Sequence, residues 1–235
     1  MKASPEELKK RYGGRKLDAS RLKTYHSISG FAHPELAVIT TKAPDEFSFM
    51  KWGLIPFWTQ DEMKGGLFAK NNLNAKSETV FHLPSFKSVI KSKRCIIPVT
   101  GFFEWRDCNK QKYPYYITLK EESIFSLGGI FDTWPNKSTG EIINSFSIIT
   151  TPANPLMAKI HNLKERMPLI LPRVKEELWI TPDAPESTIK ELMHPFDDNL
   201  MKAHTISKRI TNRKEDPNNP ATTEPFDYPE LALFD

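Results

Sequence analysis

The chain has 235 residues, of which 39% are hydrophobic and 26% charged, and its formal net charge is +4. This length fits one large domain or two small ones, and the composition is globular rather than disordered or fibrous. The sequence contains no apolar run of about 18 residues, no apolar signal-peptide core at its start and too few cysteines for a disulfide framework. We expect a soluble protein of a reducing compartment.

Charge is distributed unevenly along the chain. Residues 215–235 contain six acidic residues and no Lys or Arg, so residues 1–214 carry a formal charge of +10. A basic body favours an anionic partner, nucleic acid first, whereas a contribution to solubility alone is the alternative. We expect a single domain over 1–214, followed by an acidic tail over 215–235 that contains Pro and Asn and extends over the body.

Local signals predict the elements in chain order. Ser4, Pro5 and Glu7 form a helix start with a capping box, and the helix ends before Gly13. Runs of β-branched and aromatic residues between turn signals predict strands over 36–41, 47–54, 95–99, 113–119, 123–127 and 146–151. Helices are predicted over 85–90, 154–161, 175–179 and 187–193. This mixture predicts an α+β fold, a curled and mostly antiparallel sheet or barrel with peripheral helices.

Two titratable residues stand in apolar segments. Glu104 lies in the sequence GFFEW (101–105), where desolvation would raise its pKa and make it a general acid or base. The alternative is a Glu that points outward from a strand. His161 follows an apolar helical pattern and suits a proton donor near neutral pH. A histidine stabilised at a helix C-terminus is the alternative.

The segment LNAKSET (73–79) brings Asn74, Lys76 and Glu78 close together. Asn is suited to orient a substrate, Lys to pair with a phosphate, and Glu to fix the Lys. A polar turn before a short helix is the structural alternative.

The segment WGLIPFW (52–58) has two Trp and one Phe within seven residues, flanked by lysines. Aromatic residues beside lysines suit the stacking of single-stranded bases, at about 1–3 kcal/mol per base. The alternative is that Trp52 and Trp58 join the hydrophobic core.

Metal and cofactor chemistry has little support. The other histidines lack zinc-ligand spacing, the two cysteines form no CxxC pair, and neither a phosphate loop nor a dinucleotide fingerprint occurs. Cys95 fits packing inside an apolar strand, and Cys108 stands in a polar turn that gives no reason for a low thiol pKa. We therefore expect no metal and no cofactor.

Together these segments resemble the SRAP family, the SOS response-associated peptidases, which also sense abasic sites in single-stranded DNA. The resemblance covers about residues 25–210 and rests on the order of five motifs. These are WGLIPFW (52–58), LNAKSET (73–79), PVTGFFEW (98–105), ANPLMAKIHN (153–162) and RMPLIL (166–171). It implies an α+β fold around a curled antiparallel sheet, with a basic groove for single-stranded DNA.

The resemblance implies active-site roles for Asn74, Glu104 and His161. In the family, a Cys directly after the initiator Met captures the ring-opened aldehyde of an abasic sugar as a thiazolidine, and the proteins are self-processing peptidases. His161 and Glu104 would relay protons during ring opening, and Glu104 would assist the loss of water after amine attack. Asn74 would hold the nucleophile or the sugar.

The resemblance also implies DNA contacts for Trp52, Trp58, Lys76 and Arg166. Lys76 stands where the family usually has a phosphate-contacting Arg, so it keeps the charge but loses the bidentate fork. Arg166 matches the Arg that follows the active-site His, with 163–165 resembling an insertion between them.

Residue 2 is Lys, where the family has Cys. Three explanations stay open. The natural protein starts upstream, or it is a single-stranded DNA-binding module without catalysis, or another amine, such as that of Met1 or a Lys, forms a Schiff base. Whether the chain is an enzyme stays open with them. We expect a cytoplasmic monomer, nucleoid-associated if bacterial, with abasic single-stranded DNA as partner and no membrane contact.

Overall fold

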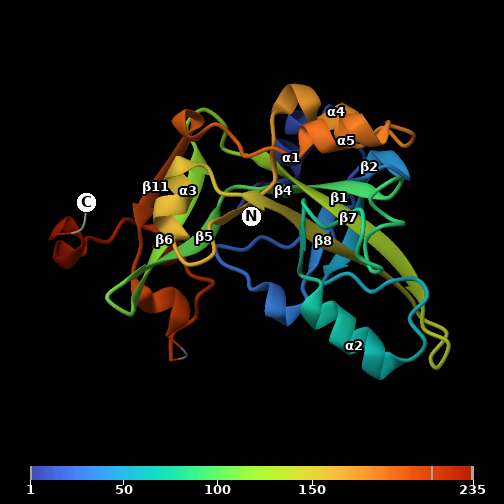
Figure 1. Cartoon of the computed structure of the whole chain (residues 1–235), viewed down its shortest axis with the longest axis horizontal. Coiled ribbons are helices and arrows are strands. Elements are labelled where there is room, and N and C mark those ends of the chain that lie inside the picture. The colour runs from blue at the N-terminus through green and yellow to red at the C-terminus, as the bar shows by residue number, and fades with distance from the viewer. Residues whose placement is uncertain (1, 213, 234–235) are drawn as a thin grey trace.

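Five strands close into a barrel at the centre of the protein (Figure 1). The computed structural model describes residues 2–212 and 214–233. Neighbouring barrel strands pair antiparallel, except that β2 and β8 run parallel where the ring closes. The barrel strands are β1 (Glu35–Thr40), β2 (Ala43–Trp52), β4 (Arg94–Val99), β7 (Phe125–Pro135) and β8 (Ile142–Pro152). The α+β fold with a curled sheet or barrel is therefore confirmed.

Short strands extend the barrel where the predicted motifs lie. β3 (Asn74–Lys76) pairs with β8 in parallel, and β9 (Arg166–Pro168) pairs with the end of β8 antiparallel. β10 (Ile170–Leu171) adds to β7. The segments 74–76 and 166–168, which lie about 90 positions apart in sequence, therefore both contact Thr150 of β8.

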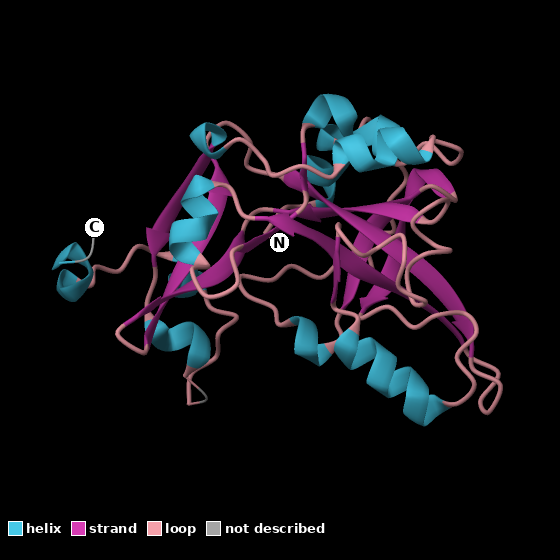
Figure 2. Cartoon of the chain, viewed as in Figure 1, coloured by secondary structure: helices cyan, strands magenta, loops and turns pink. Residues whose placement is uncertain are grey.

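A second sheet of three strands stands beside the barrel (Figure 2). It consists of β5 (Phe102–Cys108), β6 (Gln111–Leu119) and β11 (Met201–Thr205), paired antiparallel. Helix α3 (Pro155–Ile160) packs on β5, and Asn154 caps α3 by accepting a hydrogen bond from the Met157 amide at 2.8 Å. This packing fixes where α3 ends, directly before His161.

The remaining helices lie on the outside. They are α1 (Pro5–Arg11), α2 (Glu62–Asn71), α4 (Glu176–Trp179) and α5 (Glu186–Leu192). The predicted capping box of α1 is confirmed, because the Ser4 amide donates to Glu7 at 2.7 Å and the Glu7 amide to Ser4 at 3.2 Å. No helix of the described residues is long and apolar enough to cross a membrane.

One helix prediction is wrong, and one helix was missed. Residues 85–90 form successive turns instead of a regular helix, and the amides of Val89 and Ile90 both donate to the Phe86 carbonyl, at 3.1 and 3.0 Å. Helix α2 was not predicted, because Gly65 and the glycine after it lower helix propensity. The fold needs that glycine, since a Cβ on Gly65 would lie 3.0 Å from the Trp134 ring.

Buried charges anchor α4 to the barrel. Arg94 of β4 is fully buried, and its guanidinium donates to five backbone carbonyls, those of Ile90, Lys91, Trp179, Thr181 and Pro182. Close by, buried Glu176 accepts two hydrogen bonds from Arg11 and one from Ser126. Every one of these contacts is made within the protein.

The C-terminal segment, residues 215–233, follows the free edge of β11. The Phe226 amide donates to the Thr205 carbonyl at 2.9 Å, and the Tyr228 hydroxyl donates to the Ile206 carbonyl at 2.9 Å. Thr222 is fully buried against the body. The segment thus covers an edge strand, while the division of the chain at residue 214 stays a prediction.

Candidate functional site

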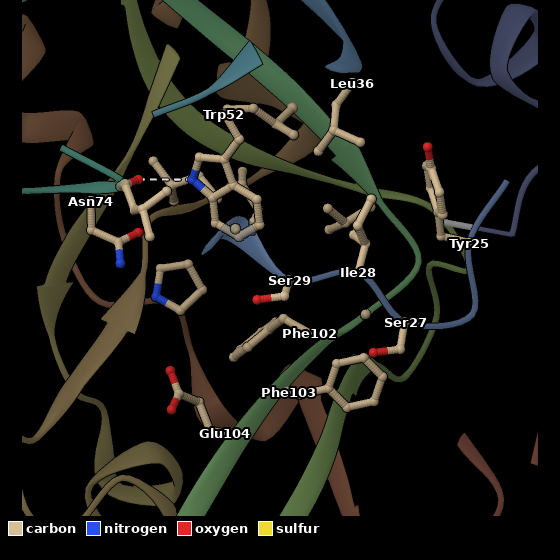
Figure 3. A pocket seen from close by; sticks show the side chains of 18 of the residues that line it. Tyr25, Ser27, Ile28, Ser29, Leu36, Trp52, Asn74, Phe102, Phe103 and Glu104 are labelled. Carbon is tan, nitrogen blue, oxygen red and sulfur yellow. Dashed lines mark hydrogen bonds between the residues drawn. The ribbon is translucent and has the colours of Figure 1, made fainter. Parts of the chain in front are cut away.

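One cavity of about 750 Å³ brings together six of the seven predicted site residues (Figure 3). Glu104 of β5, Asn74 of β3 and Trp52 of β2 face a common space. All five barrel strands contribute to the wall, so the cavity lies at the mouth of the barrel, a usual position for a binding site. The six residues are Trp52, Asn74, Lys76, Glu104, His161 and Arg166.

Strand alternation places Asn74 and Lys76 together. Ala75 between them is buried, while both neighbours are exposed and line the cavity. Successive side chains of a strand point to opposite faces, so the two polar residues share one face. Residues 74–76 of the segment LNAKSET thus form a short strand, and residues 77–79 form a turn.

Glu104 is a partly buried carboxylate beside a histidine. Its Oε2 lies 3.7 Å from Nδ1 of His161, and each side chain is between 20 and 25% exposed. Burial raises the pKa of Glu104 above its ordinary value of 4.5, although the charges of His161 and Lys164 and the backbone amide of Trp105 act in the opposite direction. A carboxyl group in this environment retains a proton to higher pH than one in water.

The backbone fixes the orientation of His161. Its Nδ1 lies 2.9 Å from the carbonyl oxygen of Arg166, which can only accept a hydrogen bond. Nδ1 therefore carries the hydrogen, and Nε2 of the neutral ring is an acceptor.

Residues 163–165, which resembled an insertion, form the turn that makes this contact. The Glu165 amide donates to the His161 carbonyl at 2.8 Å, and Glu165 takes the left-handed conformation with φ of 48°. This turn returns the chain from α3 to β9 and brings the Arg166 carbonyl to the imidazole.

Arg166 is bound by its neighbours through both terminal nitrogens of its guanidinium, whereas its buried Nε has no hydrogen-bond partner within the described part of the chain. Its guanidinium binds both carboxylate oxygens of Glu78 and also donates to the carbonyl and hydroxyl of Thr150. The ion pair lowers the pKa of Glu78 to about 2. The expectation that Glu78 would fix Lys76 is wrong, because the carboxylate faces Arg166 instead.

Trp52 and Trp58, both expected to contact DNA, lie in different parts of the structure. Trp52 lines the cavity, donates from Nε1 to the Leu73 carbonyl at 2.9 Å, and lies nearly parallel to Phe146 with ring centroids 6.2 Å apart. Gly30 packs against its ring so closely that a Cβ there would lie 3.1 Å from the indole. Trp58 lies outside the cavity, where its ring meets the edge of Phe68 and stays 42% exposed.

Sequence reasoning missed the wall opposite Asn74 and Glu104. This wall includes Tyr25 and Ile28 of the loop before β1 (Figure 3) and Pro217 of the C-terminal segment. The two segments are joined where the His26 amide donates to Asn218 at 2.7 Å. Neither segment has periodicity or a chemical motif, so the fold alone reveals this wall.

Neither cysteine belongs to the cavity. Cys95 is buried in β4, and burial raises the pKa of its thiol, while Cys108 stands at the end of β5 away from the lining residues. Among the described residues, no group of three or more His, Cys, Asp or Glu is placed to hold a metal ion.

Comparisons with known proteins define the family. Residues 1–213 match the family described as SOS response associated peptidase (SRAP), and the chain belongs to it. It is 35% identical over 191 residues to the abasic site processing protein YoqW of Bacillus subtilis, covering 80% of this chain and 81% of that protein. It is 29% identical over 185 residues to the abasic site processing protein HMCES of Xenopus tropicalis, covering 70% of this chain and 53% of that protein.

Solved structures agree with this assignment. The crystal structure of a protein from Bacteroides thetaiotaomicron superposes with a TM-score of 0.91 at 40% identity, covering 97% of this chain and 98% of that chain. A protein from Bordetella bronchiseptica superposes with a TM-score of 0.76 at 24% identity, covering 88% and 97%, and supports the fold alone.

Proposed function

We propose that this protein binds single-stranded DNA and recognises abasic sites, with the abasic sugar in the cavity beside Glu104. The observation that carries the proposal is the convergence of an amide, a partly buried carboxyl, an imidazole and cations on one cavity, in a chain whose relatives are named abasic site processing proteins. We place this activity in the cytoplasm, on the nucleoid if the source is bacterial.

The cavity chemistry suits an abasic sugar. Opening the sugar ring to the aldehyde moves a proton from the anomeric hydroxyl and returns one to the ring oxygen. The Nε2 acceptor of His161 suits the first transfer, and Glu104, whose pKa is raised by burial, suits the second. Asn74 offers a donor and an acceptor to hold the sugar.

The covalent step of the family needs an amine and a thiol at one place. Neither Cys95 nor Cys108 lines the cavity. Lys2 does not line it either: its amide donates to Thr100 at 3.3 Å, its ammonium group donates to Thr223 at 2.5 Å, and burial lowers the pKa of that group. We therefore propose that the residues of this sequence recognise the abasic site without a thiazolidine bond. Met1, the other amine considered, falls outside the described residues.

A second candidate is a single-stranded DNA-binding module without chemistry. It is favoured by the exposed rings of Phe57 and Trp58, which are 52% and 42% exposed and lie outside the cavity. Rings of this kind stack on any base, so binding through them is indifferent to the presence of an abasic site.

Fluorescence anisotropy on two oligonucleotides that differ in one abasic site tests the proposal. We expect the wild-type chain to prefer the abasic strand, and Glu104→Gln to lose most of that preference while binding to the intact strand persists. Glu121→Gln, which changes an exposed carboxylate in the turn between β6 and β7, is the matched control. Equal affinity of wild type for both strands would refute abasic recognition and favour the second candidate.

The same mixtures on a denaturing gel report any covalent bond. We expect no band that survives denaturation, because the cavity lacks a thiol. A surviving band would contradict recognition without a covalent bond, and mapping the attached residue would identify the amine.

A further inference from the structure

The positively charged side chains that line the cavity differ in whether they already form an ion pair within the protein. Arg166 is paired with Glu78 through two hydrogen bonds. Lys23, Lys76 and Lys164 also line the cavity, and their ammonium groups have no hydrogen bond or ion pair within the described part of the chain. A phosphate entering the cavity therefore meets free positive charge on these lysines and a committed guanidinium on Arg166.

The turn after α3 directs Lys164 toward the cavity. The Lys164 amide donates to the His161 carbonyl at 3.2 Å, which places this lysine within the same short turn that orients the imidazole. The charge of Lys164 acts on Glu104, where it lowers the pKa of the carboxyl group against the effect of burial. Lys164 is thus a free cation on the side of the cavity where the sugar would react.

We propose that the ammonium group of Lys164 binds the DNA phosphate next to the abasic sugar and so positions that nucleotide against Glu104 and His161. The inference rests on the proposed function and adds a residue to it, since Lys76 and Arg166 were the basic DNA contacts that the family resemblance implied. A phosphodiester is singly charged, and a free lysine pairs with it without first breaking an ion pair.

Phosphate binding at Lys164 also changes Glu104. The phosphate neutralises a charge that favours the carboxylate form, so Glu104 holds its proton more strongly in the complex. Bound DNA thus favours the protonated form of Glu104, which is the form that donates a proton during ring opening. The other titratable groups of the cavity wall, which contribute to any pH profile, are Lys23, Tyr25, His26, Glu35, Lys76, Tyr116, His161 and Arg166.

The test measures how the affinity for the abasic strand depends on salt. Each phosphate contact to single-stranded DNA contributes about 0.7 to the slope of log K against log salt. We expect Lys164→Ala to reduce the slope by about 0.7 and Lys164→Arg to restore it. Lys159→Ala is the control, because Lys159 is exposed on α3 and lies outside the cavity.

A second readout separates a charge effect from a packing effect. We expect the acid–base midpoint of abasic-strand binding to move to higher pH in Lys164→Ala than in wild type, and not to move in Lys159→Ala. If wild type binds the abasic strand but Lys164→Ala and Lys159→Ala give the same salt slope, the role of Lys164 is overturned while the proposed function stands. A wild-type chain that does not bind single-stranded DNA would overturn the proposed function and this inference together.

Discussion

Arg94 is fully buried and Glu104 is partly buried, yet the surroundings of the two side chains differ. Arg94 donates to five backbone carbonyls, and Glu176 nearby accepts from Arg11 and Ser126. Glu104, by contrast, has Nδ1 of the His161 imidazole 3.7 Å away, and the exposed lysines of the cavity have no ion-pair partner among the described residues. The polar groups around Arg94 are satisfied by hydrogen bonds within the protein. The charged groups around Glu104 remain available to a bound ligand.

Replacing the buried arginine has the largest expected effect. We expect Arg94→Met to lower the free energy of unfolding by about 3–5 kcal/mol, because five carbonyls lose their donor in the interior. Urea unfolding followed by circular dichroism measures the loss. Arg173→Met, which removes the same charge from an exposed position beside α4, is expected to change stability by less than about 0.5 kcal/mol. Equal effects of the two variants would remove the contrast between the regions.

Replacing Asn74 tests the contribution of the cavity around Glu104. Asn74→Ala removes a neutral hydrogen bond to the sugar, which is worth about 1–1.5 kcal/mol, so we expect the preference for abasic DNA to fall roughly tenfold. Thermal stability is expected to stay near that of wild type, because Asn74 is exposed. Competition binding with Asn71→Ala as the control measures this, and a large loss of stability would show that Asn74 is structural.

Glu104→Gln is expected to stabilise the fold, in contrast to Arg94→Met. The raised pKa of Glu104 means that the folded state holds its proton when the unfolded state has released it. Wild-type stability therefore falls as pH rises above the ordinary value of 4.5, and Gln removes this loss. We expect the melting temperatures of variant and wild type to coincide at acid pH and to separate at neutral pH, with the variant higher. A difference independent of pH would contradict this cause.

The ion pair of Glu78 with Arg166 has the smallest expected effect. Glu78 is about half exposed, so Glu78→Gln is expected to cost less than about 1 kcal/mol. Its contribution is present above pH 4.5 and is lost as the pH falls toward 2. Because the change frees Arg166, we also expect tighter and more salt-dependent binding of single-stranded DNA. Unchanged binding would show that Arg166 does not contact a phosphate.

The sequence predicted most of the barrel and the polar side of the cavity. The strands over 95–99 and 146–151 follow from apolar runs, and the placement of Glu104 and His161 in one site was implied by the family resemblance. The partner of Glu78 was not predictable, because the pairing depends on β3 and β9 meeting on β8. Likewise, Trp58 stands in the same motif as Trp52, but the turn at Gly53 and Pro56 sends it outside the cavity.

The hydrogen bond between His26 and Asn218 joins two parts of the cavity wall that lie 192 positions apart in the chain. A chain still being synthesised completes the barrel strands, which end at Pro152, well before residue 218 emerges. The fold therefore has an order of assembly in which the reactive side chains are made before the C-terminal part of the wall that encloses them. Until residues 217 and 218 have been added, the cavity is open to water on that side.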